Sequence, residues 1–437
     1  MTGERTHWYR TVVAFGVASM LCVVGCAASD QNAEAETIVA FGPYLGAEAD
    51  RLVDSLQEYS DKTGLVIHYT GSTDFVSDLN RRVDSADAPD IAFIPQTGLI
   101  AQLIDDQAIV PLNAETSAQL TDNYDPDVRA IVNFGGPDYV VPFRRTLKSV
   151  VWFRRDVFEA ENWAVPTTLD ELEELSGIIA GSDRVIAPWC FALNAGDATG
   201  WAATDWVEDL VLRRQGPDFY DEWAVGTVEF ADPAIAAAFA EFRTLVLEPG
   251  RIVGGVVGAI SQRVDRAWEP LLQSEPGCAM YRQADFAIGW MPTGTASGPD
   301  ESLDWFLLPG AAAETVPGST PLVIGGDGIV QFNDRPEVAG LMTFLASADA
   351  GTPWARSGGF LSAKSSIPLD VYPEVEKEFI ALLATSDIQV FDASDQMQPE
   401  IGSGLLWPEI TKWVGGGISY KKFAETIDTA RKAQALL

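Results

Sequence analysis

Histidine, the side chain that most often performs acid–base catalysis or binds zinc, is scarce in this sequence. Of two histidines, His7 lies in the N-terminal segment, which leaves His68 for the rest of the chain. One imidazole cannot build a Ser-His-Asp triad, an HExxH zinc site or a cluster of histidine ligands. The sequence also lacks a G-x-S-x-G turn, a P-loop, a CxxC pair and a calcium loop. We therefore expect no cofactor, no metal site and no enzymatic activity.

Carboxylates are the abundant chemical group. There are 63 Asp and Glu against 29 Lys and Arg, so the net charge is -34. Such a surface repels phosphate backbones, and nucleic acid is not expected as a partner. Paired carboxylates serve glycosidases when they lie about 5–9.5 Å apart. Because 63 acids produce close pairs by chance, this signal is weak, and a carbohydrate hydrolase stays an alternative.

Alternating strands and helices must position any site in the first part of the chain. A length of 437 residues suggests two or three domains of roughly 150 residues each. Apolar runs at 37–41, 65–69 and 91–94 predict strands, and patterns after each predict helices. This order indicates βαβ units and a parallel sheet. Such sheets bind ligands beyond the carboxyl ends of their strands, here the loops 42–44, 70–74 and 95–98.

The same pattern restarts after residue 140. A Thr168–Glu171 capping box and an Asp232-Pro233 pair predict the starts of two helices. We expect extended segments at 140–143, 149–153, 185–193, 277–291, 305–308 and 321–332, and mainly helices from Pro336 onwards. The fold class expected is α/β, with two lobes joined by several crossings and a helical C-terminal part.

The N-terminus reads as a targeting signal. Residues 12–24 are apolar, which is short for about 30 Å of hydrocarbon but suits a signal peptide. Small residues before Cys26 resemble the lipobox of bacterial lipoproteins, in which this cysteine is lipidated. The resemblance implies a signal peptide at 1–25, a tether at 26–36 and anchoring outside the cytoplasmic membrane through lipid alone. An ordinary cleaved signal with an incidental cysteine remains the alternative.

Four cysteines then divide into distinct roles. Cys22 is removed with the signal and Cys26 carries the lipid, which leaves Cys190 and Cys278. In an oxidising compartment two remaining thiols in folded regions are expected to pair. We predict a Cys190–Cys278 disulfide.

Ten short stretches spread along nearly the whole mature chain carry a resemblance: 71–75, 89–96, 147–152, 188–190, 198–206, 278–283, 317–321, 325–327, 356–360 and 391–395. They resemble the solute-binding proteins of ABC sugar importers, most closely their α-glucoside-binding branch. Each is weak alone, and together, behind a lipobox, they are specific. The resemblance implies a two-lobe periplasmic-binding-protein fold of the class II type, with a ligand cleft between hinged lobes.

It also implies a division of the chain and a function. The N-lobe would take 37–142 and 320–360, the C-lobe 143–308 and 364–437, and hinge crossings 309–319 and 361–363. The expected function is to bind an α-glucoside, a disaccharide or glucosyl-polyol, and deliver it as a monomer to an ABC permease. A surface-anchored carbohydrate hydrolase, or a lipoprotein that bridges other proteins, is the alternative.

A sugar site needs aromatic rings for the apolar faces of the pyranose and polar groups for its hydroxyls. The candidate rings are Tyr44, expected to be exposed at the first strand end, Trp201, Phe286, Trp290 and Trp407. The polar candidates are Ser72, Asp74, Gln96, Lys148, Asp197, Gln283, Asp327 and Arg356. Ser72 and Asp74 have helix capping as the alternative, and Lys148 has pairing with a carboxylate. Trp206 is expected in the core.

Overall fold

The computed structural model describes residues 36–292, 295, 303–312 and 320–434. The predicted signal peptide, the lipidation site Cys26, all of the tether except Glu36 and residues 313–319 of one crossing lie outside this part. Among the helices that the structure describes, none has the length and apolar character needed to cross a bilayer.

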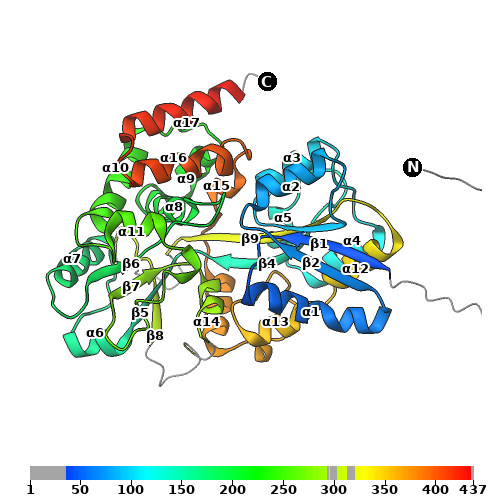
Figure 1. Cartoon of the computed structure of the whole chain (residues 1–437), viewed down its shortest axis with the longest axis horizontal. Helices are drawn as coiled ribbons and strands as arrows, with labels where there is room; N and C mark the ends of the chain where they lie inside the picture. The colour runs from blue at the N-terminus through cyan, green and yellow to red at the C-terminus, as the bar shows by residue number, and fades with distance from the viewer. Residues whose placement is uncertain (1–35, 293–294, 296–302, 313–319, 435–437) are drawn as a thin grey trace, which may run out of the picture. The chain divides into compact units, whose positions relative to one another are not determined.

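One sheet has seven strands in the order β10-β4-β9-β3-β1-β2, with β11 paired to β9 (Figure 1). The strands are β1 (Thr37–Gly42), β2 (Val66–Gly71), β3 (Ile91–Ile94), β4 (Val141–Leu147), β9 (Leu322–Gln331), β10 (Leu361–Ser362) and β11 (Gln389–Phe391). As predicted, β1 is parallel to both β2 and β3. The sheet as a whole is mixed, because β9 runs antiparallel to β3 and β4.

The helices around this sheet are α1 (Ala47–Thr63), α2 (Phe75–Asp84), α3 (Thr97–Asp105), α4 (Ala114–Asn123), α5 (Pro126–Ile131), α12 (Pro336–Ala346) and α13 (Thr352–Ser357). Apolar patterns predicted α1, α2 and α3, which follow β1, β2 and β3. Helix α1 buries Leu52 and Leu56 and ends at Gly64, whose φ of 74° is left-handed. Phe143 and Phe360, with ring centroids 5.0 Å apart, belong to the aromatic core of this half.

The second sheet has four strands in the order β6-β7-β5-β8. They are β5 (Val150–Arg154), β6 (Ala187–Cys190), β7 (Cys278–Arg282) and β8 (Leu303–Leu307). The predicted disulfide is present: Cys190 and Cys278 lie on the neighbouring strands β6 and β7, with Cα atoms 5.5 Å apart. This separation is typical of bridged cysteines.

The remaining helices are α6 (Arg155–Glu161), α7 (Leu169–Ala180), α8 (Trp201–Gln215), α9 (Pro217–Ala224), α10 (Pro233–Phe242), α11 (Gly255–Ser261), α14 (Glu374–Thr385), α15 (Ala393–Gln396), α16 (Trp407–Val414) and α17 (Tyr420–Gln434). Most of them lie beside the four-stranded sheet in Figure 1. Both predicted helix starts are confirmed, because Thr168 caps α7 and Asp232 caps α10. Trp206 is buried in the core, as expected.

The extended segment predicted over 277–291 is wrong in its second half. After β7 the chain forms a short helical segment, Asp285–Trp290. The apolar residues Phe286, Ile288 and Trp290 alternate as in a strand, but the turn instead brings the rings of Phe286 and Trp290 to 5.0 Å. The alternation misled the prediction because short apolar runs do not distinguish a strand from a turn of helix.

The chain passes from one sheet to the other within two residues. Strand β4 ends at Leu147 and β5 begins at Val150, so Lys148 and Ser149 connect them. Residues 144–147, which were predicted to belong to the C-lobe, pair with β9 in the seven-stranded sheet. The exact limits of the two lobes otherwise remain a prediction.

Candidate functional site

A cavity of about 530 Å³ opens between the strand ends of the seven-stranded sheet and the loops of the four-stranded half. This volume lies within the range of roughly 300–1,000 Å³ typical of small-molecule sites. The predicted loops after β1, β2 and β3 all contribute to its lining, through Tyr44, Ser72 and Gln96. Helix starts and strand ends thus converge from both halves, as the fold class requires.

Most of the predicted site residues come together around this cavity. Those in its lining are Tyr44, Ser72, Gln96, Lys148, Asp197, Trp201, Phe286, Trp290, Asp327 and Trp407. Three others lie outside the lining. Asp74 accepts a hydrogen bond from the backbone of Asp197, the side chain of Gln283 bonds the backbone of Ala284, and Arg356 is exposed at the end of α13.

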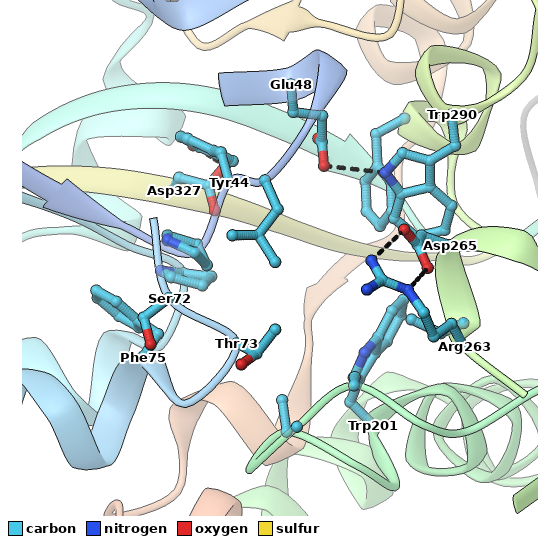
Figure 2. A pocket seen from close by; sticks show the side chains of 18 of the residues that line it. Tyr44, Glu48, Ser72, Thr73, Phe75, Trp201, Arg263, Asp265, Trp290 and Asp327 are labelled. Carbon is cyan, nitrogen blue, oxygen red and sulfur yellow. Dashed lines mark hydrogen bonds and ion pairs between the residues drawn. The ribbon is translucent and has the colours of Figure 1, made fainter. Parts of the chain in front are cut away.

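The wall supplied by the seven-stranded sheet is a chain of hydrogen bonds and ion pairs. One oxygen of Asp327 on β9 accepts from Nε of Arg144 and from the hydroxyl of Tyr44, each at 2.7 Å. Glu48, in the first turn of α1, accepts from Nη1 of Arg144 at 2.9 Å. Its other oxygen accepts from Nε1 of Trp290 at 2.9 Å, across the cavity (Figure 2).

Tyr44 is buried, at 2% exposed, so the expectation of an exposed ring is wrong. Its ring packs edge-on against Trp354 at 5.3 Å, and the guanidinium of Arg144 lies 5.0 Å from its centroid. Burial, followed by the neighbouring Asp327 carboxylate, raises the pKa of Tyr44 well above its usual value. The phenol therefore stays neutral and holds Asp327 in place.

The opposite wall is aromatic. Phe286 lies 6.2 Å from Trp201 and 5.0 Å from Trp290, so three half-buried rings follow one another along the cavity. Cations lie over two of them: Arg144 is 5.1 Å from the Phe286 centroid and Lys148 is 5.6 Å from that of Trp201. Trp268 and Trp407 also line the cavity.

Lys148 lies in a buried acidic cluster beneath Trp201. Its ammonium bonds the carboxylates of Asp392 and Asp205, the latter at 3.2 Å, and lies 3.8 Å from Asp395. Of the two alternatives left open for Lys148, the carboxylate pairing is therefore present, although the residue also lines the cavity.

The pKa values in this cluster follow from burial and from Lys148. Burial raises the pKa of Asp205 to about 6 and that of Asp395 well above its usual range, the nearby Asp392 adding to both. Burial also opposes ionisation of Asp392, but the Lys148 ammonium outweighs it and lowers the pKa of that carboxyl.

Within the described residues, one group of carboxylates has the spacing of metal ligands: Asp205, Glu208 and Asp392, whose oxygens approach within 4.8 Å. Lys148 already supplies a positive charge to two of them. Both oxygens of Glu208 accept bonds from the backbone amides of Ala393 and Ser394. The donors around this group are those of an ion-pair network, in which Oδ2 of Asp205 has no hydrogen-bond partner among the described residues and lies 3.5 Å from Nη1 of Arg282.

Sequence reasoning missed Glu48, Arg144, Phe75 and Trp268, which also line the cavity. Arg144 carried a usable signal, because a charged side chain within the apolar strand Val141–Leu147 must find a buried partner. Glu48 carried none, since an acid in the first turn of a helix is common whether or not it has a distant partner.

Comparison with known proteins places this geometry in a family. Residues 49–352 match the family model described as bacterial extracellular solute-binding protein. The osmoprotective compounds-binding protein GgtB of Synechocystis sp. is 31% identical over 92% of this chain and 94% of its own length. The α-glucosides-binding periplasmic protein AglE of Rhizobium meliloti is 32% identical over 87% and 84%, respectively.

Solved structures share the fold at low sequence identity. The bacterial solute receptor AcbH superposes with a TM-score of 0.77 at 15% identity, covering 92% of this chain and 98% of its own. Maltose-bound MalE3 of T. maritima gives a TM-score of 0.70 at 16% identity, covering 92% and 100%. The chain thus has the two-lobe α/β fold of these receptors, and it belongs to the family of bacterial extracellular solute-binding proteins.

Proposed function

We propose that this protein binds a neutral carbohydrate, an α-linked glucoside of disaccharide or glucosyl-polyol size, and delivers it unchanged to the permease of an ABC importer. The observation that carries the proposal is the pairing of an aromatic wall with a hydrogen-bonding wall across one cavity. A pyranose has apolar faces and a rim of hydroxyls, so it suits such a cavity.

The charges around the cavity favour a neutral ligand over an anion. Arg144 is paired with Asp327 and Glu48, and Lys148 with Asp392 and Asp205. An anionic ligand would have to displace one of these carboxylates from its cation, which costs roughly 3–5 kcal/mol. A hydroxyl needs only to add a bond to a pair that stays intact.

A second observation, at Gln96, also supports a ligand that bears hydroxyl groups. Its side-chain oxygen Oε1 is buried and bonds none of the described residues. An unsatisfied buried acceptor costs about 1–3 kcal/mol, and a ligand that donates a hydrogen bond there recovers that cost. Gln96 opens α3 at the end of β3, among the loops where the fold class places its ligands.

The hydrolase alternative is disfavoured because most carboxylates lining the cavity are already engaged. Both oxygens of Glu48 accept bonds, Asp265 is held by two bonds from Arg263, and Asp327 carries two bonds on one oxygen. A glycosidase needs one protonated and one free carboxyl group facing each other. Burial raises the pKa of two carboxyl groups in this lining, Asp395 and Asp197, and Asp197 already accepts two bonds from Ser77.

The place of action follows from the family and the N-terminal signal. We propose that the chain acts outside the cytoplasmic membrane, tethered through a lipid on Cys26 after removal of residues 1–25. The names of GgtB and AglE, which refer to osmoprotective compounds and α-glucosides, support an α-glucoside as ligand. Mass spectrometry of the purified protein should detect acylation at Cys26 and lose it in Cys26→Ser.

Thermal melting of the full chain tests the proposal. Maltose, sucrose and trehalose are compared with the β-linked cellobiose, and the sugar is recovered afterwards for chromatography. At a concentration of 100 times Kd, a bound ligand stabilises the folded state by about 2.7 kcal/mol. We expect a rise in Tm with at least one α-linked sugar, a smaller rise with cellobiose, and recovery of intact sugar.

Two variants control this experiment. Asp183→Ala changes an exposed acid outside the cavity lining and should keep the full shift. Asp327→Asn removes a charge from the hydrogen-bonding wall and should lose most of the shift in Tm that the sugar produces. Release of monosaccharide would establish the hydrolase alternative, and no shift with any of the sugars would refute carbohydrate binding.

A further inference from the structure

Two segments that follow strands of different sheets meet at one edge of the cavity. The loop 194–199 follows β6 of the four-stranded sheet, and helix α2 follows β2 of the seven-stranded sheet. Oδ2 of Asp197 accepts from the backbone amide of Ser77 at 3.2 Å and from its hydroxyl at 3.0 Å. In return, the amide of Asp197 donates to Oδ1 of Asp74 at 3.1 Å.

Helix α2 has no side-chain cap of its own. Asp74 stands at its N-cap position, but no cap bond forms there because this carboxylate faces Asp197. Ser72, the other candidate, accepts from the amide of Asp74 and donates to Asp78. The cap that satisfies an amide in the first turn of α2 therefore comes from the other half of the molecule.

Gly196 lets the two backbones approach. Its φ is +65°, and a Cβ placed on it would lie 2.3 Å from the carbonyl oxygen of Thr73 in the loop before α2. Thr73 and Gly196 both line the cavity, on opposite sides of its edge (Figure 2 labels Thr73). Any residue other than glycine would strain the backbone and push the halves apart.

We infer that Asp197 and Gly196 form a latch with the N-terminus of α2, which holds the two halves closed over the ligand and sets how long the ligand stays bound. The inference rests on the proposed function, and it assigns to Asp197 a positioning role between the halves in place of the ligand contact expected from sequence. A latch made in the closed state slows release of the ligand and leaves its entry unaffected.

A matched pair of helix caps provides the test. Asp197 caps the ten-residue helix α2 from the other half, and Asp232 caps the ten-residue helix α10 from within its own half. Dissociation of maltose, sucrose and trehalose from the full chain is followed by tryptophan fluorescence after rapid dilution. Hydrogen exchange at the amide of Ser77 is measured with and without sugar.

Asp197→Ala should raise koff about tenfold, the expected loss for hydrogen bonds to a charged acceptor, and change kon by less than about twofold. Asp232→Ala should lower Tm and leave koff unchanged. Asp197→Asn retains an acceptor oxygen and should restore most of the retention. Gly196→Ala should raise koff at least as much as Asp197→Ala. The amide of Ser77 should exchange faster in Asp197→Ala than in wild type, and its exchange should be unchanged in Asp232→Ala.

Equal koff values for wild type, Asp197→Ala and Gly196→Ala would overturn the latch while leaving carbohydrate binding intact. If none of the three sugars binds the wild type, the proposed function fails. Hydrogen exchange at the Ser77 amide then tests the latch independently of sugar binding. Exchange at Ser77 that does not respond to Asp197→Ala would overturn it.

Discussion

The two walls of the cavity are built in different ways. On one side Arg144 and Asp327 lie on the central strands β4 and β9, and a continuous set of bonds runs through them from Tyr44 to Glu48. On the other side Trp201, Phe286 and Trp290 lie on a helix start and a short helical turn. The walls therefore separate directional recognition from non-directional contact.

This division has a physical reason. A hydrogen bond to a hydroxyl depends on distance and angle, so its protein partner gains from a rigid sheet. Ring stacking tolerates small displacements, because apolar contact is not directional. The hydrogen bond from Trp290 to Glu48 and the cation–π contact of Arg144 with Phe286 join the two walls. The sheet wall should therefore determine which sugar binds, and the aromatic wall mainly how tightly.

The largest effect is expected from breaking the sheet wall. Asp327→Ala leaves the buried Arg144 with one partner fewer and Tyr44 without an acceptor. We expect a loss of stability of about 3 kcal/mol, as for other buried pairs, and a loss of affinity of about 100-fold or more. Chemical denaturation and calorimetric titration measure the two. An affinity within twofold of wild type would show that this wall does not contact the ligand.

A second change weakens the four-stranded half without touching either wall. Replacing Cys190 and Cys278 together by serine removes a bridge that spans 88 residues. We expect the free energy of unfolding to fall by about 2–4 kcal/mol, with affinity unchanged. Equal stability of reduced and oxidised protein would contradict the prediction, and a large loss of affinity would show that the bridge also positions the aromatic wall.

The aromatic wall should be more tolerant. Trp201→Ala removes a stacking surface and should weaken binding about tenfold, whereas Trp201→Phe keeps a ring and should stay within about threefold. The ratio of affinities for maltose and trehalose should be the same in both variants, since the sheet wall is intact. A changed ratio would mean that Trp201 takes part in specificity.

The smallest effect concerns Asp285, which begins the helical turn of the aromatic wall. Burial raises the pKa of its carboxyl to about 7, so between about pH 4 and pH 7 the folded chain keeps a proton that the unfolded chain has lost. Stability contributed by this proton is thus lost as the pH rises through that window.

Asp285→Asn does not titrate, and its amide oxygen can still accept from the backbone of Leu147, as Oδ1 does at 2.6 Å. We expect the variant to be more stable than wild type at pH 8, by on the order of 1 kcal/mol, and equally stable near pH 4. Urea denaturation at both pH values measures this. A difference independent of pH would indicate a packing effect instead.

Local patterns predicted much of the fold. The strand Ile91–Ile94 is a continuous apolar run, and the Thr168 cap follows from its capping box, so each could be read from adjacent residues. The turn at Asp285–Trp290 could not, because its alternating apolar residues also fit a strand. Gln96 was predicted to line the cavity because it stands at a strand end, and Trp201, which begins α8, because it lies in a glycine-rich stretch.

Bonds between distant segments could not be predicted. Glu48 reaches a tryptophan 242 positions away, and Asp197 caps a helix 120 positions before it. Glu48 was not distinguished from the many exposed acids, and Asp197 was predicted as a ligand contact, not as a helix cap. The position of a carboxylate in a network of this kind depends on how the two halves of the chain fold together.

The central claim is that the cavity binds a neutral sugar and leaves it unaltered. Calorimetric titration of the full chain with trehalose, sucrose and maltose, followed by chromatography of the recovered ligand, tests it most directly. We predict saturable binding of at least one of these sugars at a single site, weakened about 100-fold or more in Asp327→Ala, with all of the ligand recovered intact. An affinity of Asp327→Ala within twofold of wild type, no binding of any sugar, or recovery of cleaved sugar would contradict it.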